Sequence, residues 1–384
     1  MVGAVHGLHD PAREHDSCGF GLIAQLDDAP SRQFVASALA ALQRLAHRGA
    51  VGADGKTGDG CGLLVRRPDA FLRAVAAEAG IPVGHEFTAG TIFLPRHERA
   101  AARARGVLAE ELERIAVRVA GWRVVPVDAN ACGDGAKRSL PRIEQVFVAP
   151  DAGMDQASFK RALFLARRRA EQRLADLPDF FVVTLSAATL GYKAMVLPTA
   201  LAQFYPDLAR DDFASSVAVF HQRFSTNTAP RWSLAQPFRV LAHNGEINTI
   251  EGNRRWALAR TAKWRTPVID LRELKPAVSL HGSDSQSLDN MLELLLAGGM
   301  DLLQAMRILV PPATTAIEAS DPDLAAFYEY HSLNVDPWDG PAGLVMCEGR
   351  YAACTLDRNG LRPARWTLSR DRVFAVASET GVWD

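Results

Sequence analysis

Hydrophobic and polar residues alternate along this chain in short runs that are typical of half-buried strands. The first such run, Cys18 to Leu26, is followed by Ser31 to Ala46, where apolar residues return at helical spacing and Ser31 is placed to cap the helix. Two glycine-rich turns between Gly52 and Gly62 lead into the apolar run Leu63 to Val65 and then a helical stretch from Asp69 to Ala79. The chain is therefore predicted to open as strand, helix, strand, helix.

The same kind of pattern continues to the end of the chain. Further strands are predicted at 91–94, 124–127, 145–148, 180–186, 217–220, 344–347 and 373–377. Helices with one apolar and one charged side are predicted at 96–119, 156–174, 250–263 and 286–297. Many strands with helices before, between and after them indicate a layered fold in which sheets pack together and helices cover the outside.

Composition and charge narrow the classes of partner. With 48% hydrophobic residues, the 384-residue chain can bury one large core, and its net charge of -1 gives no field for nucleic acid or an anionic membrane. The basic run Arg167 to Arg169 lies near Glu171 on a predicted helix, as in a solvated helix face. No apolar run is long enough to span a bilayer, and residues 1–17 lack the apolar centre of a signal peptide. We expect a cytoplasmic protein that binds neither nucleic acid nor membranes.

The cysteines offer candidate nucleophiles rather than disulfides. There are five of them, Cys18, Cys61, Cys132, Cys347 and Cys354, with no pair at the two-residue gap typical of zinc or redox sites. We therefore expect neither a disulfide framework nor a metal site. Cys61 lies in a glycine-rich turn but has no nearby base in sequence, and it and the other three cysteines after Cys18 fit small buried hydrophobes. Cys18 depends on its neighbours for any chemical role.

Several short segments next to predicted strands are dense in glycine, small polar residues and charges, as functional loops usually are. They are residues 18–21, 47–49, 57–60, 221–228, 241–246 and 282–285. Each also has an ordinary structural explanation. Cys18 fits a packed strand residue, residues 47–49 fit the cap of a helix, and Asn244-Gly245 fits a hairpin turn.

In this order and at these separations, the segments resemble a known family. The strings that carry the resemblance are CGFGLIA from Cys18, HRGAVGADGKTGDGCGLL from His47, FHQRFSTNT from Phe220, LAHNGEINT from Leu241 and HGSDSQSLDN from His281. Together they resemble the class II glutamine amidotransferases, the N-terminal nucleophile type, and most closely the glutaminase domain of the glutamate synthase large subunit. The resemblance implies an α+β fold, a four-layer αββα sandwich with two antiparallel sheets.

The resemblance also implies a mechanism. In the family the nucleophilic cysteine is the first residue of the mature protein, which here implies a leader of residues 1–17 and an amidotransferase domain of residues 18–384. A free α-amino group titrates at about 7.7 to 8.0 and can act as a general base near neutral pH, whereas a mid-chain amide cannot. The Cys18 sulfur would attack the glutamine amide, release ammonia and leave a glutamyl thioester.

Further residues match positions of the family that bind substrate or stabilise charge. The side chain of Asn244 and the backbone N–H of Gly245 would form the oxyanion hole. Arg223 and Asp284 would hold the carboxylate and the ammonium of glutamine. The remaining matches are Arg48 and Gly49 beside the nucleophile, Thr226 and Ser225 on a loop that closes over glutamine, and Gly282 next to Asp284. His221, His243 and His281 lie in or beside the motifs and are expected to be structural.

Full glutamate synthases continue with a central domain, a flavin-binding barrel that carries an iron–sulfur cluster, and a β-solenoid, which this sequence lacks. The expected function is hydrolysis of L-glutamine to glutamate and ammonia, the ammonia passing to a synthase-domain partner that makes glutamate from 2-oxoglutarate. FMN and the iron–sulfur cluster are expected in that partner and no cofactor in this chain. The alternative is a non-catalytic glutamine-sensing module that keeps its leader. A hydrolase for another amide is disfavoured by Arg223 and Asp284.

Overall fold

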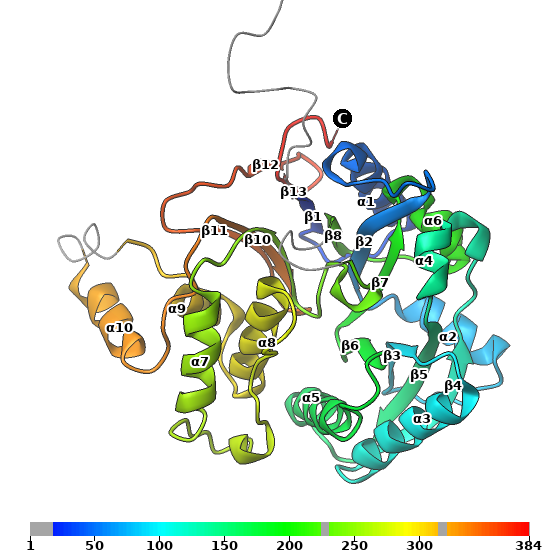
Figure 1. Cartoon of the computed structure of the whole chain (residues 1–384), viewed down its shortest axis with the longest axis horizontal. Helices are drawn as coiled ribbons and strands as arrows, with labels where there is room; N and C mark the ends of the chain where they lie inside the picture. Colours follow the sequence, from blue (N-terminus) through cyan, green and yellow to red (C-terminus); the bar gives the residue numbers. More distant parts are fainter. Residues whose placement is uncertain (1–17, 224–229, 314–320, 384) are drawn as a thin grey trace, which may run out of the picture.

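The structure, a computed structural model, describes residues 18–223, 230–313 and 321–383 (Figure 1). These residues form three sheets whose paired strands all run antiparallel. The leader of residues 1–17 and the predicted substrate contact Thr226, with Ser225, lie outside the described residues.

The six-stranded sheet has the order β12-β13-β1-β8-β2-β7. Its strands are β1 (Gly19–Gln25), β2 (Thr57–Arg66), β7 (Thr189–Val196), β8 (Val217–Gln222), β12 (Arg365–Leu368) and β13 (Val373–Ala377). Helices α1 (Arg32–Arg44) and α2 (Asp69–Glu78) pack their apolar sides against one face of this sheet. As predicted, Ser31 caps α1, its hydroxyl accepting a hydrogen bond from the N–H of Phe34 at 3.4 Å.

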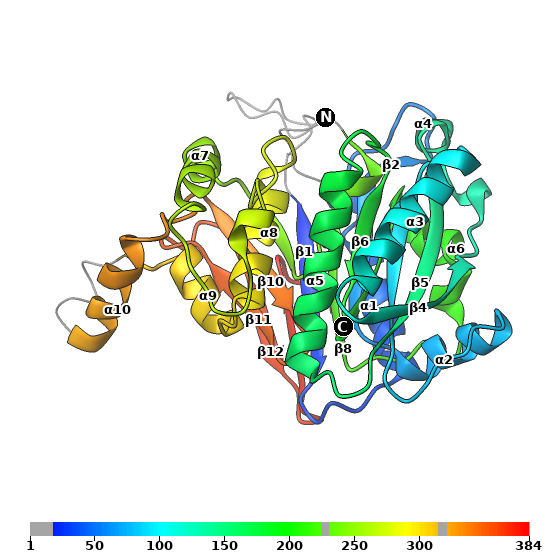
Figure 2. The ribbon, with the colours of Figure 1, turned by 90° about the horizontal axis from the view of Figure 1, so that it is seen from below.

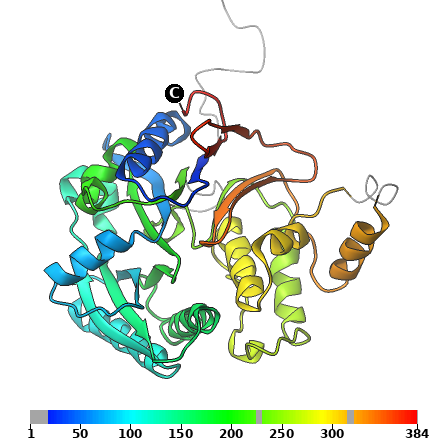
Figure 3. The same cartoon turned by 180° about the vertical axis from the view of Figure 1, so that it is seen from behind.

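The three-stranded sheet has the order β11-β10-β9 and packs on the other face of the six-stranded sheet. Its strands are β9 (Leu241–Gly245), β10 (Ala342–Cys347) and β11 (Ala352–Leu356). Its outer face is covered by α7 (Ile250–Arg260), α8 (Asp284–Ala297) and α9 (Leu302–Leu309). Figure 3 shows β10 and β11, in orange, between blue β1 and the yellow helices. The layers follow the order helix, sheet, sheet, helix, so the predicted α+β sandwich is confirmed.

A four-stranded sheet of order β4-β5-β3-β6 adds to this sandwich. Its strands are β3 (Thr88–Leu94), β4 (Val117–Val124), β5 (Arg142–Pro150) and β6 (Phe181–Leu185). Figure 2 shows α3 (Glu98–Glu113) and α5 (Gln156–Arg173) side by side over one face, where they form a core with the sheet. The other face contributes to the same core as α1 and α2. This third sheet was not separated from the others by the sequence pattern.

Some predicted elements differ from the observed ones. The helix predicted at 96–119 ends at Glu113, because Ala116 adopts a positive φ of 60° and the chain then enters β4. The strand predicted at 124–127 was therefore placed too late. The turn predicted around Thr57 to Gly60 belongs to β2, where a bulge separates Thr57 from Cys61. Short or weakly patterned elements were missed, namely β7, β9, β11, β12, α4 (Asp134–Arg138), α6 (Leu201–Phe204), α9 and α10 (Pro322–Ser332).

Candidate active site

Cys18 directly precedes β1, an interior strand of the six-stranded sheet, and its side chain is buried. The next residue, Gly19, pairs with Gln222 at the end of β8, so the ends of these two strands meet at the cysteine. Burial raises the pKa of the Cys18 thiol to about 12, and two pairs of charged residues change it further in opposite directions. Arg223 and Arg362 lower this pKa, and Asp59 and Asp284 raise it. The thiol thus lies among two guanidinium groups and two carboxylates.

Arg223 follows directly after β8 and has a backbone conformation that is uncommon for a side-chain-bearing residue. Its φ is 83°, in the left-handed region, where strain is tolerated only if the surroundings hold the residue in place. Its N–H donates to the carbonyl of Gly60 at 2.8 Å. Its Nε lies 3.4 Å from Asp59 Oδ2 in an ion pair whose two side chains are almost fully buried. Both contacts anchor Arg223 to β2.

Asp59 is a residue of this site to which the sequence motifs gave no role. Its Oδ2 accepts a hydrogen bond from the N–H of Ala50 at 3.0 Å. A Cβ on Gly49 would lie 3.0 Å from Asp59 Oδ1 and only 1.7 Å from Gln222 Nε2, so any larger residue would displace the Gln222 side chain. The structure therefore brings Gly49 to the same place as Arg223 and Cys18. In the sequence, Asp59 is a single acidic residue between Gly58 and Gly60, and this is the one feature that could have marked it as a site residue.

Arg48 reaches the strand of the nucleophile indirectly. Its guanidinium forms an ion pair with Glu379, with Nε 2.7 Å from Oε2, and His47 pairs with the same carboxylate at 2.8 Å. Glu379 follows Ser378, whose N–H donates to the carbonyl of Phe20 at 3.0 Å. Arg48 thus supports the chain segment that is bonded to β1 two residues after the cysteine.

Asn244 and Gly245 form the end of β9 rather than the hairpin turn that their spacing predicted. They pair with Gly343 and Ala342 of β10. Gly245 has a φ of 140°, and a Cβ there would lie 1.8 Å from the carbonyl oxygen of Pro341, so no other residue fits. The Asn244 side chain is buried, and its Oδ1 has no hydrogen-bond partner among the described residues. A buried amide oxygen without a partner is rare in folded proteins.

Asp284 is the first residue of α8, after the helix cap Ser283. Its Oδ2 accepts a hydrogen bond from the N–H of Ile247 at 2.9 Å, and its Oδ1 accepts one from the N–H of Ser285 at 2.7 Å. The buried carboxylate therefore connects α8 to the segment that follows Gly245. Gly282 lies just before the helix, and its carbonyl accepts a hydrogen bond from Arg254 Nη2 at 2.6 Å. Gly282 thus helps to hold this loop in place.

Two buried histidines link the elements that carry these residues. His221 Nε2 of β8 lies 3.0 Å from the carbonyl oxygen of His243 in β9, and His243 Nδ1 lies 2.8 Å from Ser285 Oγ in α8. Burial lowers the pKa of His221 to about 3 and also lowers that of His243. Both rings are therefore neutral near pH 7 and join β8, β9 and α8. Their predicted structural role agrees with these contacts, and His281 is exposed.

Cys61 does not compete with Cys18 as a nucleophile. Its side chain lies in the core beneath α1, its thiol donates to the carbonyl of Val196 at 3.4 Å, and burial raises its pKa strongly. A cysteine packed in the hydrophobic core in this way acts as a small apolar side chain and is inert. Among the described residues, no group of three or more His, Cys, Asp or Glu side chains is placed to hold a metal ion. Within the same residues, no helix is long and apolar enough to cross a membrane.

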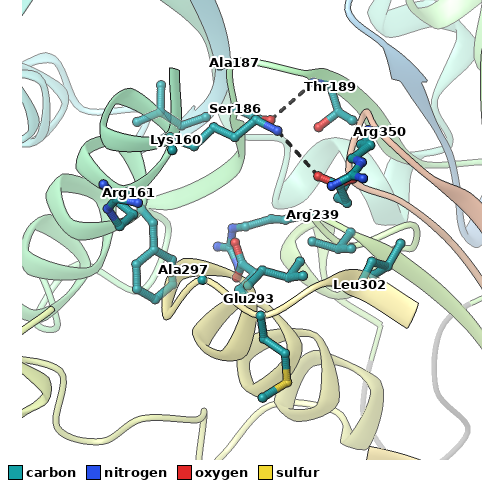
Figure 4. A pocket seen from close by; sticks show the side chains of 18 of the residues that line it. Lys160, Arg161, Ser186, Ala187, Thr189, Arg239, Glu293, Ala297, Leu302 and Arg350 are labelled. Atoms are coloured by element: carbon teal, nitrogen blue, oxygen red, sulfur yellow. Dashed lines mark hydrogen bonds and ion pairs between the residues drawn. The ribbon is translucent and has the colours of Figure 1, made fainter. Parts of the chain in front are cut away.

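A cavity of about 400 Å³ lies at the other end of β9, between α5, α8 and the turns that join β6 to β7 and β10 to β11 (Figure 4). None of the described residues proposed for the active site lines it. In its wall, Arg167 forms ion pairs with Glu171 at 3.0 Å and Glu293 at 2.8 Å. Arg239 pairs with the same two carboxylates. Arg167 is 1% exposed, so its prediction as part of a solvated helix face was wrong.

Comparison with known proteins agrees with this geometry. Residues 18–384 match the family model of the class II glutamine amidotransferases. The chain is 40% identical over 380 residues to the glutamate synthase (NADPH) large chain of Azospirillum brasilense, a match that covers 97% of this chain and 25% of the relative. It is 38% identical to the glutamate synthase (NADPH) large chain of Bacillus subtilis, covering 98% of this chain and 25% of that relative.

A third relative is named as ferredoxin-dependent. The ferredoxin-dependent glutamate synthase 2, chloroplastic, of Arabidopsis thaliana is 40% identical over 387 residues, covering 98% of this chain and 24% of the relative. The chain spans about a quarter of the length of these relatives. The family model covers nearly the whole chain, starting at Cys18. The chain therefore belongs to the class II glutamine amidotransferases.

Proposed function

We propose that this chain is the glutaminase part of a glutamate synthase and hydrolyses L-glutamine at Cys18, passing the ammonia to a synthase domain that makes glutamate from 2-oxoglutarate. The observation that carries the proposal is the meeting of four element ends around one buried thiol. Cys18 directly precedes β1, Arg223 directly follows β8, Asn244 is the last residue but one of β9, and Asp284 begins α8. Arg223 and Asp284 lie close enough to change the pKa of Cys18.

Removal of residues 1–17 is part of this proposal, because the chemistry needs a base. In the uncut chain the nitrogen of Cys18 is an amide, and the pKa of the buried thiol is about 12. Cleavage after Ser17 gives Cys18 a free α-amino group, which can take the thiol proton directly or through a water molecule near neutral pH. The domain that remains is residues 18–384.

The reaction then proceeds in two steps, formation of the thioester and its hydrolysis. The sulfur forms a bond with the side-chain carbonyl carbon of glutamine, and the carbon–nitrogen bond breaks after the nitrogen receives the proton from the α-ammonium group. Ammonia leaves and a glutamyl thioester remains on Cys18. Water then attacks the thioester with the α-amine as base, which releases glutamate and restores the thiol.

Charge placement supports the remaining assignments. Arg223 and Asp284 carry opposite charges and both act on the Cys18 thiol. A carboxylate and an ammonium on one amino acid require such a pair of opposite charges. The side chain of Asn244 and the N–H of Gly245 are the proposed oxyanion donors. Arg48 and Gly49 support the main chain near the nucleophile, and Thr226 and Gly282 are proposed to contact or frame the substrate. FMN and the iron–sulfur cluster are assigned to the synthase domain and none to this chain.

The glutamine-sensing module is the second candidate, since it needs the same clamp for the amino acid. It does not need a cysteine at the start of β1 or a backbone at Gly245 that excludes every side chain. These two features favour the enzyme over the sensor. A sensor would also keep residues 1–17. The two candidates therefore differ in whether the mature chain begins at Met1 or at Cys18.

The test is intact mass and N-terminal sequencing of the purified protein before and after incubation with diazo-oxo-norleucine, an electrophile that mimics glutamine. We expect a chain that begins at Cys18 and gains one label there. Cys18→Ala should remain unlabelled, and Cys61→Ala, the matched control, should label like the wild type. An unlabelled chain that begins at Met1 would contradict the catalytic proposal, and stoichiometric flavin in the purified chain would contradict the cofactor assignment.

A further inference from the structure

The loop between β11 and β12 is held rigidly against the active site. The buried carboxylate of Asp357 accepts hydrogen bonds from the N–H groups of Asn359 at 2.9 Å and Leu361 at 3.1 Å. It also accepts one from the N–H of Ala342 at 3.0 Å. Ala342 is the residue of β10 that pairs with Gly245. One carboxylate therefore ties this loop to the strand beside the proposed oxyanion hole.

Arg362 is the residue that this loop places nearest to the site. Gly343 of β10 pairs with Asn244 of β9. A Cβ on Gly343 would lie 3.4 Å from Arg362 Cβ and 2.9 Å from a ring carbon of Phe20. The stem of Arg362 therefore packs over the Gly343–Asn244 pair and beside Phe20, which is two residues after Cys18.

The charge of Arg362 is not neutralised by the described part of the chain. Its Nε is buried and has no hydrogen-bond partner there, and no described carboxylate lies within ion-pair distance of its guanidinium. Arg358, on the same loop, is paired with Asp339 at 2.6 Å. A buried donor without a partner destabilises the folded protein, so an arginine that a rigid loop holds in this state suggests a use for its charge.

The charge acts on the two groups that the reaction would involve. Arg362 lowers the pKa of the Cys18 thiol and that of His243, the neighbour of Asn244. Arg223 also lowers the pKa of Cys18, but it is already paired with Asp59. Arg362 is partly exposed, but its Nε is buried. Next to a buried thiol, a cation without a counter-charge stabilises a developing anion more strongly than a paired one.

We propose that Arg362 stabilises the negative charge that forms at the Cys18 sulfur, and on the amide oxygen beside Asn244, during attack on the substrate. This inference rests on the proposed function of Cys18. It adds Arg362 to Arg223 as a second cation that acts on the Cys18 sulfur. The step is the proton transfer already described, from the thiol to the α-amine, with the electron pair left on sulfur. Arg362 neither gains nor loses a proton in it.

The test is the pH profile of Cys18 alkylation by iodoacetamide, a small neutral reagent that needs no glutamine clamp. The processed wild type is compared with Arg362→Gln, Arg362→Lys and the matched control Arg365→Gln, which changes an exposed arginine of β12. The label is mapped to Cys18 by mass. We expect Arg362→Gln to raise the apparent pKa of alkylation by about 1 and Arg362→Lys to restore most of the difference. Arg365→Gln should match the wild type.

Glutamine kinetics separate this role from a structural one or from substrate binding. Arg362→Gln should lower kcat about tenfold with little change in KM. A raised KM with an unchanged alkylation profile would overturn the inference in favour of carboxylate binding. If Arg362→Gln has a lowered melting temperature, Arg362→Met, which keeps the apolar stem, carries the same test. If diazo-oxo-norleucine does not label the wild type, the proposed function is wrong. If it does label the wild type but the pH profile of alkylation is unchanged in the Arg362 variants, only this inference is wrong.

Discussion

The carboxylate of Asp284 accepts a hydrogen bond from the main-chain N–H of Ile247 at 2.9 Å and so joins the start of α8 to the segment that follows Gly245. The same carboxylate raises the pKa of Cys18, so its charge reaches the nucleophile. In the proposed site it has two tasks, one in holding the β9 end and one in binding the ammonium of glutamine. A substitution that keeps the hydrogen bond from Ile247 but removes the negative charge can test the second task by itself.

Asp284→Asn separates these two tasks. The asparagine oxygen can still accept the bond from Ile247, but the negative charge is lost, so we expect KM for glutamine to rise about 10- to 100-fold. The amide NH2 cannot accept the second bond, from the N–H of Ser285, so the melting temperature should also fall modestly. Steady-state kinetics and thermal unfolding check this, with Asp323→Asn in the first turn of α10 as the control. An unchanged KM would place the ammonium partner elsewhere.

Gly245→Ala should damage both the fold and the site. Its φ of 140° is unfavourable for alanine, and the added Cβ would lie 1.8 Å from the carbonyl oxygen of Pro341 in the backbone. We expect a loss of about 2–4 kcal/mol in the free energy of unfolding together with a large drop in kcat. Gly252→Ala, in α7 with open space around its Cβ, is the control and should be neutral or slightly stabilising.

Arg223→Lys tests the carboxylate assignment. An ammonium lacks the planar fork that binds a carboxylate through two hydrogen bonds, so KM for glutamine should rise about tenfold or more. The backbone strain at Arg223 is the same for both residues, and the fold should remain. Arg372→Lys is a matched control, because Arg372 also has a positive φ, 59°, and pairs with Asp27 away from the site. If Arg223→Lys leaves KM unchanged, the assignment is wrong.

The elements with strong local signals were predicted from the sequence. Ser31 capped its helix as expected, and Cys18 precedes a strand that runs over Gly19–Gln25. The family strings also named Arg223, Asn244 and Asp284, whose side chains come from elements far apart in sequence. Errors arose where local signals were weak. The helix Glu98–Glu113 ends shortly before Ala116, a non-glycine residue with positive φ, and nothing in the sequence marks that stop.

Other residues could not be predicted because their importance depends on tertiary contacts. Asp59 becomes a partner of Arg223 only when β2 and β8 pair, and Arg362 reaches the site only when Asp357 closes its loop onto β10. The Arg167 side chain is buried because two carboxylates from α5 and α8 surround it. Charge patterns along one helix do not reveal which charges another element will neutralise.

The ion pairs between α5, α8 and the segment before β9 should matter for stability. Burial would raise the pKa of Glu171, but Arg167 and Arg239 outweigh it and lower that pKa to about 2. Arg167→Met leaves two carboxylates poorly compensated and should cost about 3–5 kcal/mol in unfolding free energy. Chemical denaturation measures this, with Arg169→Met, whose partner Glu273 is more exposed, expected to cost at most about 1 kcal/mol. Equal costs for both variants would contradict the buried network.

The free energy of unfolding should depend on pH through the protonation of His221. The ring is fully buried, and its pKa falls from the ordinary value of 6.5 to about 3, so the folded state keeps it neutral while the unfolded state binds a proton below pH 6.5. Stability from this group is therefore complete above pH 6.5 and is lost progressively as the pH falls toward 3. The slope approaches about 1.4 kcal/mol per pH unit, since one more proton is bound in the unfolded state.

His221→Gln removes this titrating group while an amide nitrogen can still donate toward the carbonyl oxygen of His243. The variant should be less stable than the wild type at pH 7.5, because the amide does not fill the space of the ring. The difference between the two proteins should shrink between pH 6.5 and pH 5, because only the wild type gains a proton at this position on unfolding. Urea denaturation at several pH values measures both effects. Parallel stability curves would mean that His221 is not held neutral in the folded protein.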